Sequence, residues 1–512
     1  MLIKTYAAAL QSIHAATVTI EVNITRGSWF QLVGLPDTAV RESHERIKSA
    51  IETSGYRFTD ENVIVNMSPA DLRKEGAAYD LPLAIGILAA SEQLPGEGLS
   101  HMMLMGELGL DGTLKPIKGA LPIALLARKE GYRYLIVPRA NAQEAAVVNK
   151  LKVYAADSLK DVCRFVSEGE GLELVEVDTR KEFYKGQRKY DIDFADVRGQ
   201  AHVKRALEVA AAGGHNVLMV GSPGSGKSMM AKRIPSILPP LNLSESLETT
   251  MIYSVSGKLE ANTTLMTMRP FRAPHHTISP VALVGGGSNP QPGEISLAHN
   301  GVLFLDELAE YNRAVLEVMR QPLEDRNITI ARAKYTVEYP ASFMLVAAMN
   351  PCPCGYYNHP SRECSCSPHA IQRYLGRISG PLLDRIDIQV EIVPVPFEEI
   401  SNNQPAETSE NIRDRVLNAR KRQEERFEKI PDTYCNAQMS SSQVRKYVQL
   451  DSESLQKLKL VMERFGLSAR AYDRILRVAR TIADLENSNE VKSAHIAEAI
   501  GYRNLDRSNW GQ

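Results

Sequence analysis

One eight-residue loop carries the clearest chemistry in this sequence. It fits the phosphate-binding pattern G-x-x-x-x-G-K-S and consists of Gly221, Ser222, Pro223, Gly224, Ser225, Gly226, Lys227 and Ser228. In this pattern the glycines let backbone N–H groups turn toward phosphate oxygens, the lysine reaches the β and γ oxygens, and the serine hydroxyl binds Mg²⁺. An apolar run at 216–220 precedes the loop. The order of strand, glycine-rich loop and helix predicts a site for a nucleoside triphosphate such as ATP.

Two adjacent carboxylates follow a second apolar run at 301–305. We expect Asp306 to hold Mg²⁺ through water and Glu307 to orient and polarise the attacking water, since phosphoryl transfer needs positioning and charge neutralisation. An acidic pair at a strand end is usually only a solvated turn. The phosphate-binding loop upstream favours the catalytic interpretation.

Four of the six cysteines lie close together in the sequence, whereas Cys163 and Cys435 stand alone. The clustered residues are Cys352, Cys354, Cys364 and Cys366. In a reducing compartment such a cluster favours metal binding over disulfides, and four thiolates suit tetrahedral Zn²⁺. The C-x-C spacing is tighter than the usual C-x-x-C, so unmetallated thiols remain an alternative. His359 and His369 are near enough in the sequence to replace a thiolate.

Length and charge limit the classes of protein. The 512 residues are enough for two to four domains. With 60 basic and 61 acidic residues, any nucleic-acid contact must come from a local patch. The sequence starts without a basic stretch and long apolar core, and no run of about eighteen apolar residues occurs. We expect a soluble, cytoplasmic protein that does not bind a membrane.

The elements needed to position these residues follow from hydrophobic periodicity. Up to about residue 165, strand-like runs at 17–23, 62–67 and 101–105 alternate with helical runs at 39–54, 81–94 and 120–130. This pattern predicts an α+β domain. A charged, weakly patterned stretch from Glu168 to Tyr190 reads as a linker.

A nucleotide-binding core is expected after this linker. A helix at 201–212 is stopped by two glycines, and parallel strands are expected at 216–220, 302–305 and 343–348. This is a doubly wound α/β sheet, which binds its ligand at the carboxyl ends of the strands. Helical patterns then cover 451–465, 468–485 and 493–501, and these predict a helical lid.

These motifs together resemble an AAA+ ATPase. Four longer motifs, at 269–277, 292–300, 350–355 and 379–387, are similar to those of magnesium-chelatase-like AAA+ proteins of the YifB/ComM type. The resemblance covers essentially the whole chain. It implies a Lon-protease-like α+β domain at 1–167, a linker at 168–190, an AAA+ core at 191–395 and a helical lid at 396–512.

The resemblance also assigns three polar residues. Asn350 is similar to sensor 1, Arg385 to the arginine finger that one subunit supplies to its neighbour's ATP, and Arg470 to sensor 2 on the lid. Planar, permanently charged arginines suit the charge of a transferring phosphoryl group. Three other arginines are rivals for the last two roles: Arg373, Arg377 and Arg474.

A site completed by a neighbouring subunit implies an oligomer, and the family's rings are homohexamers. Residues 324–339 read as a hairpin, which resembles the pre-sensor hairpin in the pore of such rings. Arg332 and Lys334 would contact DNA phosphates, with Tyr335 as a stacking surface. The alternative is an ordinary solvated hairpin. The segment 269–293 resembles the helix-2 insert, a second candidate pore loop.

The amino-terminal domain resembles the Lon protease fold but lacks its chemistry. Ala78 and Leu121 stand where that family carries its catalytic serine and lysine, and neither can perform acyl transfer. This excludes a protease. We therefore expect a hexameric ATP-driven motor on single-stranded or branched DNA, a helicase or branch-migration enzyme of recombination or natural transformation. The alternative is a chelatase-type ATPase that remodels a protein or metal-insertion partner.

Overall fold

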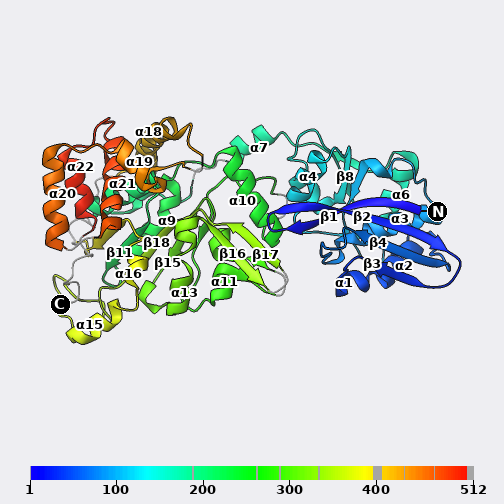
Figure 1. Cartoon of the computed structure of the whole chain (residues 1–512), viewed down its shortest axis with the longest axis horizontal. Helices are drawn as coiled ribbons and strands as arrows, with labels where there is room; N and C mark the ends of the chain where they lie inside the picture. Colours follow the sequence, from blue (N-terminus) through cyan, green and yellow to red (C-terminus); the bar gives the residue numbers. More distant parts are fainter. Residues whose placement is uncertain are drawn as a thin grey trace. The chain divides into compact units, whose positions relative to one another are not determined.

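The chain folds into two units, and neither is contiguous in sequence. The computed structural model describes residues 2–186, 190–260, 263–287, 290–332, 335–395, 406–431, 433–465 and 468–503. The first unit comprises residues 1–187 and 242–267, and the second comprises 188–241 and 268–512 (Figure 1). The segment 242–267 therefore belongs to the first unit although it interrupts the sequence of the second. The domain boundaries expected at 167, 190 and 395 stay predictions.

The first unit is built on a mixed eight-stranded sheet with the order β10-β9-β8-β5-β1-β2-β4-β3. Its strands are β1 (Leu2–Gln11), β2 (His14–Thr25), β3 (Phe30–Val33), β4 (Asn62–Ser68), β5 (Met102–Leu104), β8 (Tyr134–Pro138), β9 (Lys152–Ala156) and β10 (Glu173–Val175). A small hairpin, β6 (Glu107–Leu108) and β7 (Leu114–Lys115), lies outside it. The strands expected at 17–23 and 62–67 are confirmed within β2 and β4, and β5 confirms the centre of the strand expected at 101–105.

The first unit also contains helices, several of which pack on this sheet. They are α1 (Thr38–Arg41), α2 (Ser43–Thr53), α3 (Asp80–Ala90), α4 (Ala120–Lys129), α5 (Arg139–Ala145), α6 (Leu159–Glu168), α7 (Thr179–Gly186) and α10 (Leu243–Ser256). The helix expected at 39–54 is split at Glu42. The helix expected at 81–94 ends early because Glu92 has a φ of 60°, which a helix cannot continue.

Helix α10 is held in the first unit by a buried acid. The Ser254 hydroxyl donates to the Glu144 carboxylate, which also accepts a hydrogen bond of 2.9 Å from the backbone N–H of Leu121. Burial raises the pKa of Glu144, and these donors oppose that rise. Leu247 and Met251 add apolar contacts to the core of the unit. The segment 242–267 is therefore an integral part of this fold.

The stretch expected to be a linker carries structure of its own. Strand β10 adds to the sheet by antiparallel pairing with β9. In α7, the Thr179 hydroxyl donates to the carbonyl of Val147 at 2.9 Å. These contacts attach the described residues up to 186 to the first unit.

The second unit contains a fully parallel five-stranded sheet with the order β12-β15-β18-β11-β19. Its strands are β11 (Val217–Gly221), β12 (Phe271–Arg272), β15 (Val302–Leu305), β18 (Met344–Met349) and β19 (Ile388–Ile392). The three strands expected here are confirmed. Val220 pairs with Met349, and Leu305 pairs with Ala347. Because the strands are parallel and in register, the loops after β11, β15 and β18 emerge at one edge.

Some helices of the second unit flank this sheet, and the C-terminal helices form a lid (Figure 1). The core helices are α8 (Ala201–Gly213), α9 (Lys227–Ile237), α11 (Pro280–Val284), α12 (Glu294–Leu297), α13 (Arg313–Val318), α14 (Pro322–Asp325), α15 (Pro368–Leu375) and α16 (Gly380–Leu383). The lid helices are α18 (Ser409–Phe427), α19 (Ser441–Tyr447), α20 (Ser452–Phe465), α21 (Ala469–Leu485) and α22 (Ser493–Gly501). The expected lid helices correspond to α20, α21 and α22.

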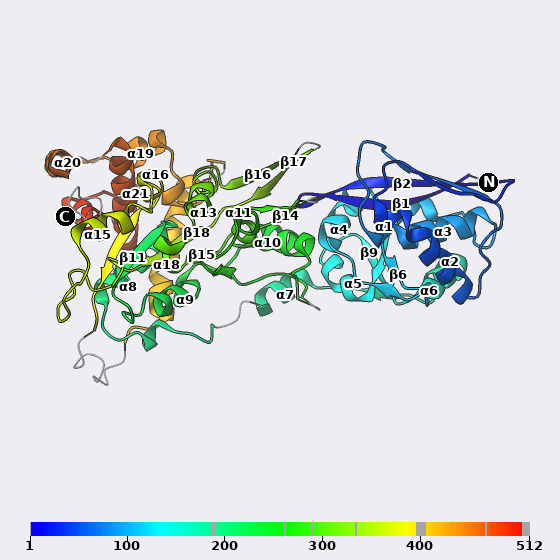
Figure 2. The same cartoon turned by 90° about the horizontal axis from the view of Figure 1, so that it is seen from below.

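Two hairpins stand apart from the parallel sheet. One is β13 (Gly285–Gly286) with β14 (Gln291–Pro292), and the other is β16 (Asn327–Arg332) with β17 (Tyr335–Pro340). Figure 2 shows the second hairpin as a long arm that leaves the core of its unit. Its strands pair from Asn327 opposite Pro340 to Arg332 opposite Tyr335, which confirms the hairpin expected at 324–339.

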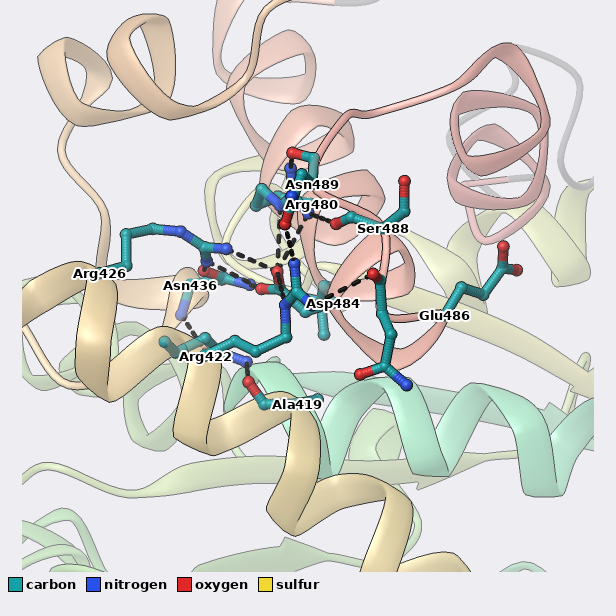
Figure 3. A network of polar contacts seen from close by, with 12 residues as sticks. Ala419, Arg422, Arg426, Asn436, Arg480, Asp484, Glu486, Ser488 and Asn489 are labelled. Carbon is teal, nitrogen blue, oxygen red and sulfur yellow. Dashed lines mark hydrogen bonds and ion pairs between the residues drawn. The ribbon is translucent and has the colours of Figure 1, made fainter.

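A buried carboxylate organises the lid (Figure 3). Asp484 of α21 is fully buried and accepts hydrogen bonds of 2.6 and 2.8 Å from Arg426 of α18. Arg480 approaches the same carboxylate at 3.1 Å, and Asn436 donates to it at 2.8 Å. Breaking such a buried pair costs roughly 3–5 kcal/mol. Asp484 therefore fixes α18 and α21 to each other.

None of the helices in the described ranges is long and apolar enough to cross a lipid bilayer.

Candidate active site

The phosphate-binding loop joins β11 to α9. Gly224 and Gly226 have φ values of 77° and 91°, which L side chains adopt only with strain. The hydroxyl oxygens of Ser222 and Ser225 are buried, and within the described ranges neither has a hydrogen-bond partner. Buried polar atoms of this kind are rare in folded proteins. The loop thus has the shape and the free hydrogen-bonding groups of a cradle for an anion.

Lys227 is buried at the start of α9. Its ammonium donates to the carbonyls of Gly221 and Ser222, at 2.6 and 2.9 Å. It also donates to Oδ1 of Asn350 at 3.2 Å. Burial lowers the pKa of Lys227, while Asp306 and Glu307 act in the opposite direction. The cation is therefore close to both acidic residues that the sequence singled out.

Asp306 contacts both of its predicted neighbours. Its Oδ2 accepts a hydrogen bond of 2.6 Å from the Ser228 hydroxyl, and its Oδ1 accepts one of 3.0 Å from the backbone N–H of Glu307. A hydroxyl and a carboxylate side by side are the hard oxygen ligands that Mg²⁺ prefers. The donor set therefore fits a magnesium site between α9 and the end of β15.

Glu307 is held in an unusual conformation. Its φ is 54°, a left-handed value that costs a non-glycine residue roughly 1–2 kcal/mol. Its carboxylate lies 3.3 Å from Nδ1 of His276. His276 packs beside His275, with ring centroids 4.1 Å apart, and meets the ring of Tyr311 edge-on. Sequence reasoning missed His276, although it lies in the motif at 269–277 that supported the resemblance.

Asn350 ends β18 beside the loop, as expected. Besides the contact of Asn350 with Lys227, its backbone lies near the hydroxyl of Tyr374. Burial raises the pKa of Tyr374 to about 12, so this phenol stays protonated. These contacts bring Lys227, Ser228, Asp306, Glu307 and Asn350 together at one edge of the sheet.

The two expected catalytic arginines lie in different environments. Arg385 follows α16, where it forms an ion pair with Glu324 and donates to the Pro381 carbonyl at 2.7 Å. Arg470 is exposed in the first turn of α21. Two of the rivals are engaged elsewhere: Arg377 pairs with Glu310 at 2.9 Å, and Arg474 pairs with Asp387 at 2.6 Å. Arg373 is exposed on α15.

The four clustered cysteines converge in space. Their sulfur atoms all lie within 4.8 Å of one another. The distances from Cys352 to Cys354 and to Cys364 are 3.3 and 3.7 Å, too long for disulfide bonds. A tetrahedron with Zn–S bonds of about 2.3 Å has sulfurs about 3.8 Å apart, so the four thiols fit Zn²⁺. Neither His359 nor His369 belongs to this group as the structure describes it.

Two of the residues expected at the DNA contact, Arg332 and Tyr335, flank the tip of the β16–β17 hairpin. Arg332 is the last residue of β16, and Tyr335 is the first residue of β17. Lys334 lies outside the described residues, and so do the side chains of Arg332 and Tyr335. The second expected pore segment, 269–293, contains β12, α11 and the β13–β14 hairpin.

Ala78 and Leu121, expected at the positions of a protease dyad, have structural roles in the first unit. The carbonyl of Ala78 accepts a hydrogen bond of 2.8 Å from Gly106, and the wholly buried Leu121 donates its backbone N–H to Glu144. Nearby Asp80 is buried against Arg46 at 2.9 Å. Burial raises the pKa of Asp80 to about 6, although Arg46 opposes the rise. These residues pack and pair within the fold.

Comparison with family models identifies three matching regions. The model for magnesium chelatase subunit ChlI matches residues 193–400. The model for subunit ChlI of Mg-chelatase matches residues 20–141, and the C-terminal model of the same subunit matches 406–503. Together these matches extend over both units.

Comparison with curated proteins gives relatives of the same length. The chain is 44% identical over 504 residues to the competence protein ComM of Haemophilus influenzae, covering 98% of this chain and 97% of that protein. It is 43% identical over 502 residues to the uncharacterized protein YifB of Escherichia coli, covering 98% and 96%. A weaker likeness, 24% over 158 residues, relates 30% of the chain to Lon protease 2 of Bacillus subtilis.

Proposed function

Because the chain belongs to the magnesium-chelatase-like family of YifB and ComM proteins, we propose that it is an ATP-driven AAA+ motor acting on DNA. The observation that carries the ATPase assignment is the set of contacts joining Lys227, Ser228, Asp306 and Asn350. The similarity to a competence protein supports DNA recombination or natural transformation as the setting. The DNA on which it acts is single-stranded or branched.

Each residue of the site has a role in ATP hydrolysis under this proposal. Lys227 exchanges its loop carbonyls for the β and γ oxygens of ATP, while the backbone of 221–226 surrounds the phosphates. Ser228 and Asp306 hold Mg²⁺, which neutralises the developing phosphate charge. Glu307 orients the attacking water, and Asn350 holds that water or the γ-phosphate. This division leaves the carboxylate of Glu307 free of the metal.

Two arginines complete the site. Arg385 leaves Glu324 and reaches the ATP of a neighbouring subunit in a homohexameric ring, and Arg470 reaches the γ-phosphate from the lid. Both would place planar cationic donors on the transferring group. The charge of Glu324 keeps Arg385 paired in the isolated chain. ATP binding would then determine how adjacent subunits pack.

The ring would act on DNA through its pore. The β16–β17 hairpin, with Arg332 and Lys334 near its tip, contacts the DNA backbone, and the cysteines hold a structural Zn²⁺. The match to the magnesium chelatase family model favours a second candidate function. This is a chelatase-type ATPase that remodels a protein or metal-insertion partner. We propose no protease activity, because Ala78 and Leu121 occupy the positions of the dyad.

ATPase assays with forked or four-way DNA test the motor and separate the two candidates. We expect such DNA to stimulate hydrolysis and its strands to be displaced, and Glu307→Gln to trap a DNA-bound ring. Replacing Arg332 and Lys334 by alanine should remove the stimulation. Replacing the exposed lid lysines Lys421 and Lys429 is the matched control. If DNA neither binds nor stimulates hydrolysis, the motor proposal fails and the chelatase-type candidate is favoured.

A further inference from the structure

The four-cysteine loop begins at the catalytic edge of the sheet. Cys352 is only two residues beyond Asn350 and is wholly buried. Asn350 in turn accepts a hydrogen bond of 3.2 Å from Lys227. Protein interiors transmit small displacements because they are closely packed. A displacement of the Cys352 side chain should therefore also displace Asn350.

The same loop touches the phosphate-binding loop directly. Gly355 has a φ of 85°, and a Cβ atom built there would lie 2.5 Å from Cδ of Pro223. The Pro223 ring therefore lies against the backbone of Gly355, with no room for a side chain between them. A hydrogen bond of 3.0 Å from the N–H of Gly355 to the carbonyl of Cys352 closes the intervening turn. One short turn thus contacts both Asn350 and the phosphate-binding loop.

The far ligands hold this turn in place. Cys364 lies 3.7 Å from the sulfur of Cys352 and 3.6 Å from that of Cys354. The backbone N–H of Cys354 donates to the sulfur of Cys366 at 3.4 Å. Thiols make only weak hydrogen bonds, whereas zinc–thiolate bonds fix all four sulfurs with respect to one another. The rigidity of the turn therefore depends on the metal.

We propose that Zn²⁺ bound by the four cysteines positions Asn350 and Pro223 for ATP hydrolysis, so that metal occupancy determines the rate of turnover. The inference rests on the proposed ATPase function and on the proposed zinc site. The cysteines are positioning residues, and zinc takes no part in the chemistry. Cys364 and Cys366 are not adjacent to Asn350 in the sequence. Replacing either of them should nevertheless displace Asn350, because the metal would no longer fix Cys352 and Cys354.

The test compares variants of the full-length protein. Cys364→Ser removes one of the four proposed zinc ligands. Cys364→His replaces that thiolate with another residue that binds zinc. Cys435→Ser is the control at a buried cysteine outside the four-cysteine loop. Zinc content, affinity for a fluorescent ATP analogue, kcat and Tm are measured for each. Gly355→Ala, which keeps all four cysteines, tests the contact with Pro223.

We expect Cys364→Ser to lose zinc and to reduce kcat by about ten- to a hundredfold, since misplacement by 1 Å can cost about a hundredfold. Cys364→His should retain zinc and most activity, and Cys435→Ser should match the wild type. Gly355→Ala should keep zinc but weaken binding of the analogue several-fold, because the added methyl group would displace the loop at Pro223 and strain it.

Each contrary outcome identifies what is wrong. A Cys364→Ser protein that lacks zinc but binds and hydrolyses ATP like the wild type overturns the inference. A wild-type protein without about one zinc per chain overturns both the inference and the zinc site. A zinc-loaded wild type without ATPase activity refutes the proposed function. In that case the inference still predicts that Cys364→Ser weakens binding of the analogue, because the displaced turn contacts Pro223, and an unchanged affinity overturns it.

Discussion

His276 reaches Glu307 across the end of the parallel sheet, with 3.3 Å between Nδ1 and Oε2. The loop after β12 thereby contacts the carboxylate that is proposed to orient water. The carboxylate is more than half exposed, so the contact is weak and readily broken. A residue of the proposed pore-lining insert is thus in contact with the glutamate that is proposed to orient the attacking water.

Removing this contact should release Glu307. We predict that His276→Ala raises the ATPase rate without DNA by roughly two- to fivefold, because half-exposed pairs are worth roughly 0.2–1 kcal/mol. His369→Ala, at an exposed position of α15 outside this loop, is the control. A lower rate in steady-state assays of His276→Ala would show that His276 assists Glu307 rather than restraining it.

Lys227 offers a separation of activity from stability. We predict that Lys227→Ala reduces ATP hydrolysis by at least about a hundredfold, since a preorganised charged donor contributes roughly that much. Its Tm should change little, because burial already disfavours the ammonium, as its lowered pKa shows. Lys232→Ala, at an exposed position of the same helix, should behave like the wild type. Retained hydrolysis would remove Lys227 from the site.

Mixing two inactive variants tests whether Arg385 acts on a neighbour. Arg385→Ala and Lys227→Ala should each be inactive alone. In randomly mixed rings about a quarter of the sites combine an intact loop with an intact arginine, so the mixture should recover about that share of the wild-type rate. A mixture as inactive as its components would mean that Arg385 does not act between subunits.

Asp387 links the sheet to the lid and predicts a dependence on pH. It accepts a hydrogen bond of 2.6 Å from Arg474 and lies 3.3 Å from His215. Burial alone would raise the pKa of Asp387, but Arg474 and His215 hold it well below its usual value. The folded state therefore binds the proton less readily than the unfolded state.

The stabilisation from Asp387 is complete above the unfolded pKa of about 3.9 and is lost as the pH falls through the lower folded value. We predict that Asp387→Asn lowers the free energy of unfolding at pH 7 by about 3–5 kcal/mol, as for other broken buried pairs. Thermal melting from pH 7 to pH 3 measures this difference in stability between the variant and the wild type. The exposed Asp414→Asn is the control. Equal Tm values at pH 7 would contradict the prediction.

The sequence predicts which residues meet at this edge of the sheet, because the signals for them are local. The loop at 221–228 and the acid pair at 306–307 each follow an apolar strand, and parallel strands place their ends together. His276 lacks such a signal, since only its tertiary contact with Glu307 distinguishes it from other loop histidines. The contact between Gly355 and Pro223 is equally invisible, because it joins residues more than a hundred positions apart.

Helix α18 shows a different difficulty. Its composition is strongly charged, yet Ile412, Val416 and Ala419 are buried at helical spacing. A count of apolar residues at three- and four-residue intervals would have found it. By contrast, no periodicity could have placed α10 in the first unit. That assignment depends on the partner of Ser254, a glutamate 110 residues earlier.

The insertion of 242–267 has a consequence for how the protein is made. During synthesis the first unit lacks α10 until residues beyond the phosphate-binding loop have left the ribosome. Ser254, the partner of Glu144, is made only after residues 188–241 of the second unit have been translated. A cut between 187 and 190 would not separate the units, because both ends of 242–267 still connect them. A fragment ending at 187 would also lack the helix that completes its own core.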